Sequence, residues 1–134
     1  MILVDTSVWI DLFGRSPGRA GLELERMIEE SEPFALTGVI VTEILQGLRR
    51  DFQRTERYLS QWDMLEPIGF STYREASALS RLARSRGISL TTIDALIASI
   101  ALENHANLFT LDQDFSHIAP FAPLRLYTLP ELAG

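Results

Sequence analysis

The chain has 134 residues, which fits one domain of ordinary size over residues 1–134 and leaves no room for a second. With 46% hydrophobic and 22% charged residues it has the composition of a globular protein, and its lack of cysteine excludes a disulfide framework, thiolate metal ligands and cysteine nucleophiles. Its formal net charge of -6 argues against a protein that coats nucleic acid through general electrostatic attraction.

The first half of the chain alternates short apolar runs with helical patterns. Apolar runs predict strands at Ile2–Val4 and Phe34–Leu36. Helical patterns occupy four segments of this half: Thr6–Phe13, Gly21–Glu30, Gly38–Leu48 and Phe52–Leu65. A loop rich in turn residues at 14–18 separates the first two. In the second helix we expect the apolar residues to face the core: Leu22, Leu24, Met27 and Ile28.

The second half repeats this alternation. Strands are predicted at Pro67–Gly69, Leu108–Leu111 and Leu124–Tyr127. Between them lie two helical segments, Thr72–Arg86 and Thr92–Asn104. Strands that are separated by helices pair in parallel, so we predict a three-layer α/β domain: a central parallel sheet of about five strands flanked by helices.

No basic leader precedes the first apolar run, so we expect no secretory signal. No uncharged apolar run approaches the roughly 18 residues that cross a bilayer. These features predict a cytoplasmic protein that does not enter the membrane.

Carboxylates follow the predicted strands where a parallel sheet collects its ligands, at the carboxyl ends. Asp5 follows the first strand, Asp112 and Asp114 follow Leu108–Leu111, and Asp94 lies in the first turn of its helix. Each has an alternative explanation as a helix cap. Asp5 could cap the helix at Thr6, Asp112 could cap a short helix through Phe115 and Ile118, and Thr91 with Asp94 resembles a capping box. Capping and metal binding can coexist, because both use acids at the same edge.

Glu43 is harder to explain as a structural residue. It shares the apolar stripe of its helix with Ile40 and Ile44, where an unpaired charge is costly. Either a metal or an arginine, Arg49 or Arg50, would compensate that charge.

Four segments therefore offer acids that this fold can bring to one edge. Clustered carboxylates repel one another, and a divalent cation relieves that repulsion. With oxygen ligands alone, the expected ion is Mg²⁺ or Mn²⁺.

The ordered set of these motifs resembles the PIN-domain nucleases, and among them the VapC-type toxins of bacterial toxin–antitoxin pairs. Four segments carry the resemblance, which spans essentially the whole chain: Ile2–Asp11, Thr42–Gly47, Thr92–Ala98 and Thr110–Phe115. The family implies a parallel-sheet core with an acidic metal centre. The catalytic and metal-binding acids implied are Asp5, Glu43, Asp94 and Asp112, with Asp114 as the second choice for the fourth ligand. Supporting hydroxyls match Thr6, Ser7 and Thr110, although Thr110 could equally be a strand residue without a role.

The resemblance implies an endoribonuclease, a cognate antitoxin that blocks it, and a homodimer. The metal chemistry predicts hydrolysis of RNA by activated water, which leaves a 5′ phosphate and a 3′ hydroxyl. Two alternatives stay open: a PIN-type RNA-processing nuclease outside a toxin–antitoxin pair, and a non-catalytic module that binds RNA or a partner. A haloacid-dehalogenase-like phosphatase is disfavoured because Ser7 stands where its second aspartate is needed, and a phosphorylated receiver is disfavoured because the chain has no lysine.

All 12 basic residues are arginine, and some of them flank the acidic motifs. Six could guide RNA or could equally be a solvated helix face: Arg15, Arg19, Arg49, Arg50, Arg54 and Arg57.

Overall fold

The structure is a computed structural model that describes residues 1–130; residues 131–134 of the predicted domain lie outside the described part. Its strands are β1 (Ile2–Val4), β2 (Ala35–Leu36), β3 (Asp63–Met64) and β4 (Asn107–Phe109). Its helices are α1 (Thr6–Phe13), α2 (Arg19–Glu29), α3 (Gly38–Gln46), α4 (Phe52–Ser60), α5 (Phe70–Ser85), α6 (Thr92–Glu103) and α7 (Gln113–Ile118). Strands and helices alternate along the chain as predicted.

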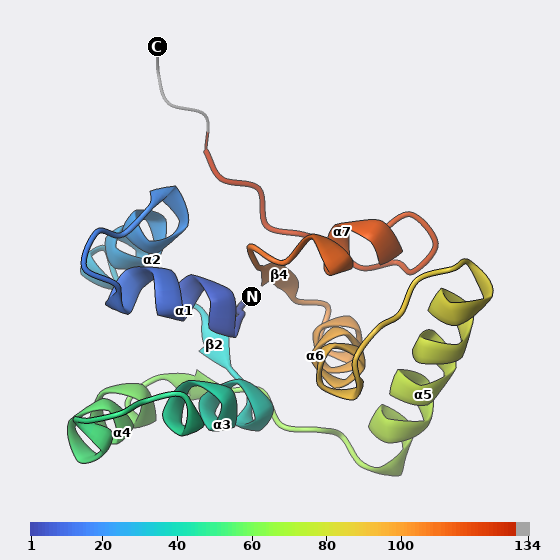
Figure 1. Cartoon of the computed structure of the whole chain (residues 1–134), viewed down its shortest axis with the longest axis horizontal. Helices are drawn as coiled ribbons and strands as arrows, with labels where there is room; N and C mark the ends of the chain where they lie inside the picture. Colours follow the sequence, from blue (N-terminus) through green and yellow to red (C-terminus); the bar gives the residue numbers. More distant parts are fainter. Residues whose placement is uncertain (131–134) are drawn as a thin grey trace.

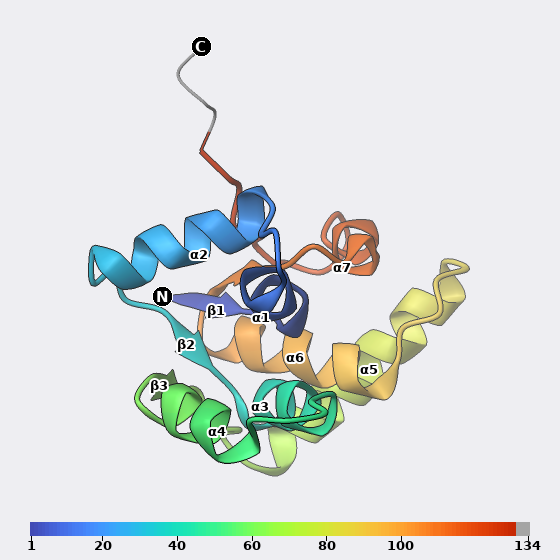
Figure 2. The same ribbon diagram turned by 60° about the vertical axis from the view of Figure 1, so that its left-hand side comes forward.

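The strands form one sheet in the order β3-β2-β1-β4, and every neighbouring pair is parallel. Helices α1 and α2 cover one face of this sheet, and α5 and α6 lie on the other (Figures 1 and 2). The predicted three-layer α/β fold is confirmed, with four strands in place of about five.

The core lies where β1 and β4 pair between these helices. Leu3 and Val4 of β1 and Leu108 of β4 are fully buried, as expected for apolar strands that are covered on both faces. Helix α6 is apolar on nearly all sides because it packs between β4 and α5. Among residues 1–130, no helix combines the length and the apolar composition that a membrane crossing requires.

Two of the predicted strands were wrong. The helix predicted to reach Leu65 ends at Ser60, and the third strand is Asp63–Met64, whereas Pro67–Gly69 leads into α5. Leu124–Tyr127 makes only an isolated parallel bridge, Leu126 with Leu108. Both backbone hydrogen bonds of this bridge involve Leu108, whose N–H donates to the carbonyl of Arg125 and whose carbonyl accepts from the N–H of Tyr127, so the pairing covers a single residue of β4.

The predicted core face of α2 was also wrong at one residue. Leu24 and Met27 are fully buried, but Leu22 is 53% exposed. Residues two apart on a helix point to different sides, so Leu22 and Leu24 cannot both face the sheet.

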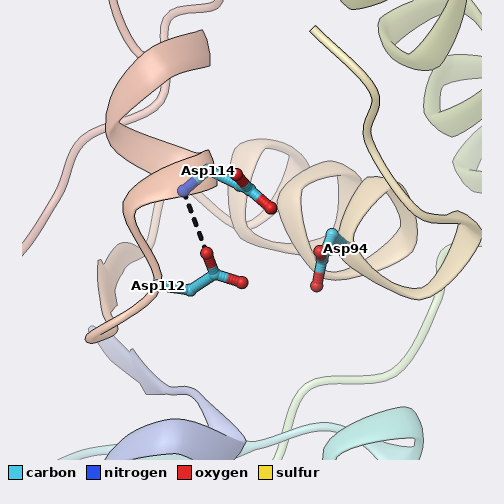
Figure 3. A group of neighbouring side chains, drawn as sticks. All are labelled: Asp94, Asp112 and Asp114. Carbon is cyan, nitrogen blue, oxygen red and sulfur yellow. Dashed lines mark hydrogen bonds between the residues drawn. The ribbon is translucent and has the colours of Figure 1, made fainter.

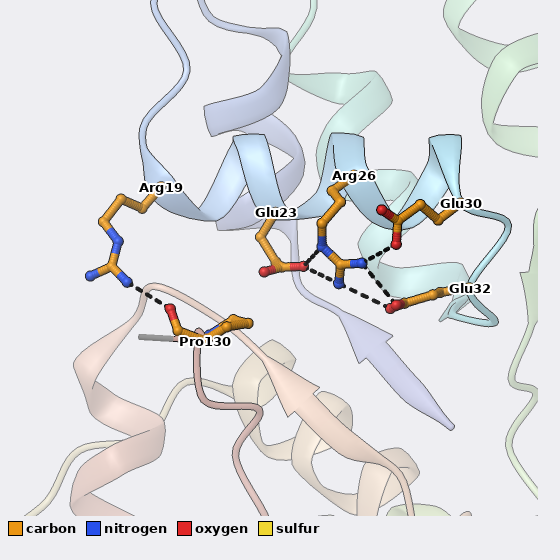
Figure 4. A network of polar contacts seen from close by, with 6 residues as sticks. All are labelled: Arg19, Glu23, Arg26, Glu30, Glu32 and Pro130. Atoms are coloured by element: carbon orange, nitrogen blue, oxygen red, sulfur yellow. Dashed lines mark hydrogen bonds and ion pairs between the residues drawn. The ribbon is translucent and has the colours of Figure 1, made fainter. Parts of the chain in front are cut away.

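A polar network holds the C-terminal end of α2 in place (Figure 4). The guanidinium of Arg26 donates hydrogen bonds to the carboxylates of Glu23, Glu30 and Glu32, with 2.8 Å between Nη1 and the nearer Glu32 oxygen. Glu32 lies beyond the helix on the approach to β2, so the network joins α2 to the segment that enters the sheet.

Candidate metal centre

Strand pairing brings two distant segments of the chain to one edge of the sheet. Val4 pairs with Phe109, so the residues that follow them, Asp5 and Thr110, emerge side by side. The backbone N–H of Asp5 continues the pairing by donating to the carbonyl of Phe109 at 2.8 Å. Helix α6 leads into β4, so its N-terminal turn, which carries Asp94, returns to the same carboxyl edge.

Three aspartates face one another at this edge (Figure 3). Asp94 comes from the first turn of α6, Asp112 precedes α7, and Asp114 lies in the first turn of α7. Each offers one carboxylate oxygen, and these three oxygens lie within 4.8 Å of one another. Two oxygens bound to one Mg²⁺ are separated by at most about 4.2 Å, twice the ordinary bond length. The three oxygens are therefore spread over about the width of one magnesium coordination sphere. Both candidates for the fourth acid, Asp112 and Asp114, lie beside Asp94.

Asp5 is held by hydroxyl groups rather than used as a helix cap. It precedes α1, but its side chain makes no capping hydrogen bond. The residue is 5% exposed, and its Oδ2 accepts hydrogen bonds from Ser7 Oγ at 2.9 Å and Thr110 Oγ1 at 2.8 Å. The capping alternative for Asp5 is therefore wrong.

The hydroxyls of Ser7 and Thr110 also bind the loop that follows β4. Ser7 Oγ accepts from the backbone N–H of Leu111 at 2.9 Å, and Thr110 Oγ1 accepts from that of Asp112 at 3.0 Å. Thr110 thus links the carboxylate of Asp5 to the backbone of Asp112. This geometry gives Thr110 a definite position in the site, beyond that of an ordinary strand residue.

Glu43 is half-buried on α3 and pairs with a residue of α1. Thr6 Oγ1 donates to Glu43 Oε1 at 2.7 Å across 37 positions of sequence, a contact for which the sequence carried no signal. Arg50, one of the two arginines expected as possible partners, instead lies 3.9 Å from Asp51. Glu43 and Asp5 fall outside the group of three aspartates, but their charges act on it.

Capping hydrogen bonds and an acidic centre coexist at the two helix ends. Thr91 Oγ1 accepts from the N–H of Asp94 at 3.1 Å, and Asp112 Oδ1 accepts from that of Asp114 at 2.9 Å. The predicted caps of α6 and α7 are therefore present. These capping hydrogen bonds orient Asp94, Asp112 and Asp114, but they bring no positively charged side chain to the carboxylates.

The pKa of Asp94 reflects how close the other acids lie to it. Burial raises the pKa of Asp94 to about 6, together with the negative charges of Asp112, Asp5 and Glu43. A hydrogen bond with Thr91 acts in the opposite direction and lowers this pKa. Within residues 1–130, no arginine forms an ion pair with these carboxylates. An all-oxygen, multiply negative group of this kind suits a hard divalent cation.

The match to known proteins covers the segments that carry these acids. A family model described as the PIN domain matches residues 2–120, which include every acid of the centre. Ribonuclease VapC11 from Mycobacterium tuberculosis is 33% identical over 129 residues, 93% of this chain and 96% of that protein. A toxin–antitoxin complex from Klebsiella pneumoniae matches with a TM-score of 0.72 and 26% identity, over 98% of this chain and 100% of that one. VapBC2 from Rickettsia felis, bound to a promoter DNA fragment, matches with a TM-score of 0.74 and 19% identity, over 95% and 98%.

Proposed function

The chain belongs to the PIN domain family, and from that premise we propose that it is a divalent-metal-dependent endoribonuclease and the toxin of a toxin–antitoxin pair. The observation that carries the proposal is the group of Asp94, Asp112 and Asp114, with Asp5 and Glu43 close enough to act on its charge. The relationship to a protein named a ribonuclease VapC supports the activity and the substrate class. The relationship to a toxin–antitoxin complex supports a cognate antitoxin as partner.

The acids of the centre would hold Mg²⁺ or Mn²⁺: Asp5, Glu43, Asp94, Asp112 and Asp114. When bound, the cation supplies Lewis-acid chemistry that polarises a phosphodiester and makes water nucleophilic at neutral pH. The protein's part is to hold its carboxylates in place before substrate arrives. Hydrogen bonds from Ser7 and Thr110 orient Asp5, and the one from Thr6 orients Glu43. No side chain needs to act as a covalent nucleophile.

The chemical test is the nature of the RNA ends. Purified protein is incubated with 5′-labelled RNA in Mg²⁺, in Mn²⁺ or in EDTA, and the termini are assigned by their response to phosphatase and ligase. We expect cleavage that requires the metal and leaves 5′ phosphate and 3′ hydroxyl ends, as follows when water attacks the phosphorus and the 3′ oxygen leaves. A 2′,3′-cyclic phosphate, or cleavage that persists in EDTA, would contradict the proposal.

The biological role needs a separate test, because a nuclease of RNA maturation would give the same ends. Expression in a bacterial host should arrest growth, and co-expression of a small protein encoded beside this chain should relieve the arrest. Growth that continues while the purified protein cleaves RNA would favour the processing nuclease. The homodimer predicted from the family stays a prediction that sedimentation can check.

A further inference from the structure

A pocket of about 870 Å³, with none of the acids of the metal centre in its lining, lies at the C-terminal ends of α1 and α3 and along α4. We call it the arginine pocket, and its lining includes four arginines and two aromatic residues: Arg49, Arg50, Arg54, Arg57, Phe13 and Tyr58. It gathers one third of the arginines of a chain whose formal net charge is -6. Four of the twelve arginines therefore lie within residues 49–57.

The guanidinium groups of the arginine pocket are largely uncompensated. Among the described residues that line it, Asp51 is the only acid, and it lies 3.9 Å from Arg50, whose side chain is 90% exposed. Arg49, Arg54 and Arg57 form no ion pair within residues 1–130. Arg54 and Arg57 are three residues apart on α4, so they project from the same side of the helix. Such free guanidinium forks suit phosphate groups.

Two helices connect this pocket to the acidic centre. Thr6 at the start of α1 donates to Glu43, and Phe13 at the end of α1 lines the pocket. Glu43 lies on α3, and Gly47, directly after that helix, also lines the pocket. At 1.5 Å per residue, the pocket begins about 6 Å from Glu43 along α3 and about 10 Å from Thr6 along α1. Those distances correspond to a few nucleotides of a polynucleotide strand.

The two aromatic residues of the pocket pack against a buried tryptophan. The rings of Phe13 and Tyr58 have centroids 6.0 Å apart, and both rings pack against the fully buried Trp9. Phe13 is nevertheless 43% exposed. A fixed, partly exposed ring beside arginines is typical of sites for single-stranded nucleic acid, because bases stack on the ring while the guanidiniums contact phosphates.

We propose that the arginine pocket binds the phosphate backbone of the RNA substrate a few nucleotides from the cleaved bond. The identity of the ligand as substrate rests on the proposed function; the recognition of a single-stranded polyanion rests on the pocket. An acidic peptide would also suit arginines, but the exposed aromatic ring and the continuity with the acidic centre favour RNA. The pocket thereby offsets the repulsion between RNA and an acidic protein.

The test measures binding without cleavage, by the fluorescence anisotropy of a labelled single-stranded oligoribonucleotide in EDTA at several salt concentrations. The variant R54Q/R57Q removes two charges from the pocket, and R74Q/R81Q removes two from α5 on the other side of the molecule (Figure 1). We expect R54Q/R57Q to weaken binding about tenfold and to reduce the slope of log affinity against log salt by about 1.4, since each phosphate contact on a single strand contributes about 0.7. R74Q/R81Q should change neither quantity appreciably.

Two outcomes would overturn the proposal: unchanged RNA binding by R54Q/R57Q, or an equal loss of RNA binding in R74Q/R81Q. If RNA binding by R54Q/R57Q is unchanged while antitoxin binding is lost, the pocket is a protein interface. If R54Q/R57Q does not fold by circular dichroism, R49Q/R50Q in the loop before α4 takes its place. Failure of the proposed nuclease is recognised separately, because RNA would then still bind through the pocket but would not be cleaved in Mg²⁺.

Discussion

One cluster of acids surrounds a cation of the protein: the guanidinium of Arg26 lies among the carboxylates of Glu23, Glu30 and Glu32 (Figure 4). A second cluster, formed by Asp94, Asp112 and Asp114, surrounds no side-chain cation within residues 1–130 (Figure 3). The two clusters also differ in their acid–base properties. The hydrogen bond from Arg26 lowers the pKa of Glu32, while burial and the neighbouring acids raise the pKa of Asp94 to about 6.

The difference separates a structural cluster from a functional one. Three glutamates around one arginine are neutralised from within the protein, and their contacts join α2 to the segment before β2. The aspartates are brought together against their own repulsion, which is why we propose that a cation from outside completes the group. Carboxylate clustering alone does not favour a metal centre; among residues 1–130, it is the lack of an arginine paired with these three aspartates that supports one.

The largest expected difference between the clusters is in RNA cleavage. Asp94→Asn removes a charge from the middle of the acidic centre, and we expect the initial rate of cleavage in Mg²⁺ to fall by about 100- to 1000-fold, as when other preorganised electrostatic groups are removed. Glu30→Gln makes the same chemical change in the Arg26 network and should leave the rate within about twofold. Equal rates for the two variants would remove the distinction between the clusters.

Thr110→Val tests whether the hydroxyls organise the acidic centre. The change deletes the hydrogen bond to Asp5 and the acceptor for the Asp112 N–H while it preserves side-chain volume. We expect the dissociation constant for Mn²⁺, measured by calorimetry, to rise about tenfold, because loss of a group that orients metal ligands has effects of this size. Thr42→Val is the matched control, since Thr42 bonds only the carbonyl of Gly38 within its own helix. An unchanged constant in Thr110→Val would mean that the hydroxyl serves folding alone.

Arg26→Met should affect stability and leave cleavage intact. It deprives Glu23, whose side chain is 8% exposed, of its counter-charge. A carboxylate that is left buried without a partner destabilises the native state, so we expect the thermal midpoint to fall by about 5 °C. Arg74→Met interrupts an exposed pair with Glu75 and should lower the midpoint by about 1 °C or less. A loss of cleavage by folded Arg26→Met would contradict the structural role of the network.

The smallest effect concerns the metal-free protein and has a definite sign. Because the folded-state pKa of Asp94 is raised from 3.8 to about 6, its contribution to stability is fully present below pH 3.8 and is lost as the pH rises through 6. In EDTA at pH 7.5, Asp94→Asn should therefore be more stable than the wild type by about 1 kcal/mol, after allowance for solvent screening of this half-buried group. The advantage should disappear near pH 4. Urea unfolding at both pH values measures it, and a less stable variant at pH 7.5 would contradict the electrostatic account.

The sequence predicted those parts of the fold in which pattern and packing agree. β1 and β4 are runs of buried apolar residues, and α6 has apolar residues at helical spacing, so each lies close to where it was expected. β3 could not be found, because Asp63 and Met64 are both exposed and no alternation marks them. Trp62 and Leu65 continue the helical spacing of α4 past Ser60, where the chain turns into the sheet.

The aspartates of the acidic centre were predicted from their places after strands and at helix starts, and Glu43 from its place on an apolar helix face, but the contacts of these residues were not predicted. The link from Thr6 to Glu43 depends on how α1 packs against α3. The choice between Asp112 and Asp114 had no answer in the sequence, because both lie beside Asp94 once α7 forms. The arginine pocket likewise depends on the loop before α4, which brings residues of three helices together.

Calorimetric titration of Mn²⁺ into the purified protein tests the central claim most directly. We predict saturable binding by the wild type and by Glu30→Gln, and binding at least about tenfold weaker, or 1.4 kcal/mol, in Asp94→Asn. Absence of binding to the folded wild type, or equal binding by Asp94→Asn, would mean that the aspartates at the carboxyl edge belong to the helix ends alone and do not form a metal centre.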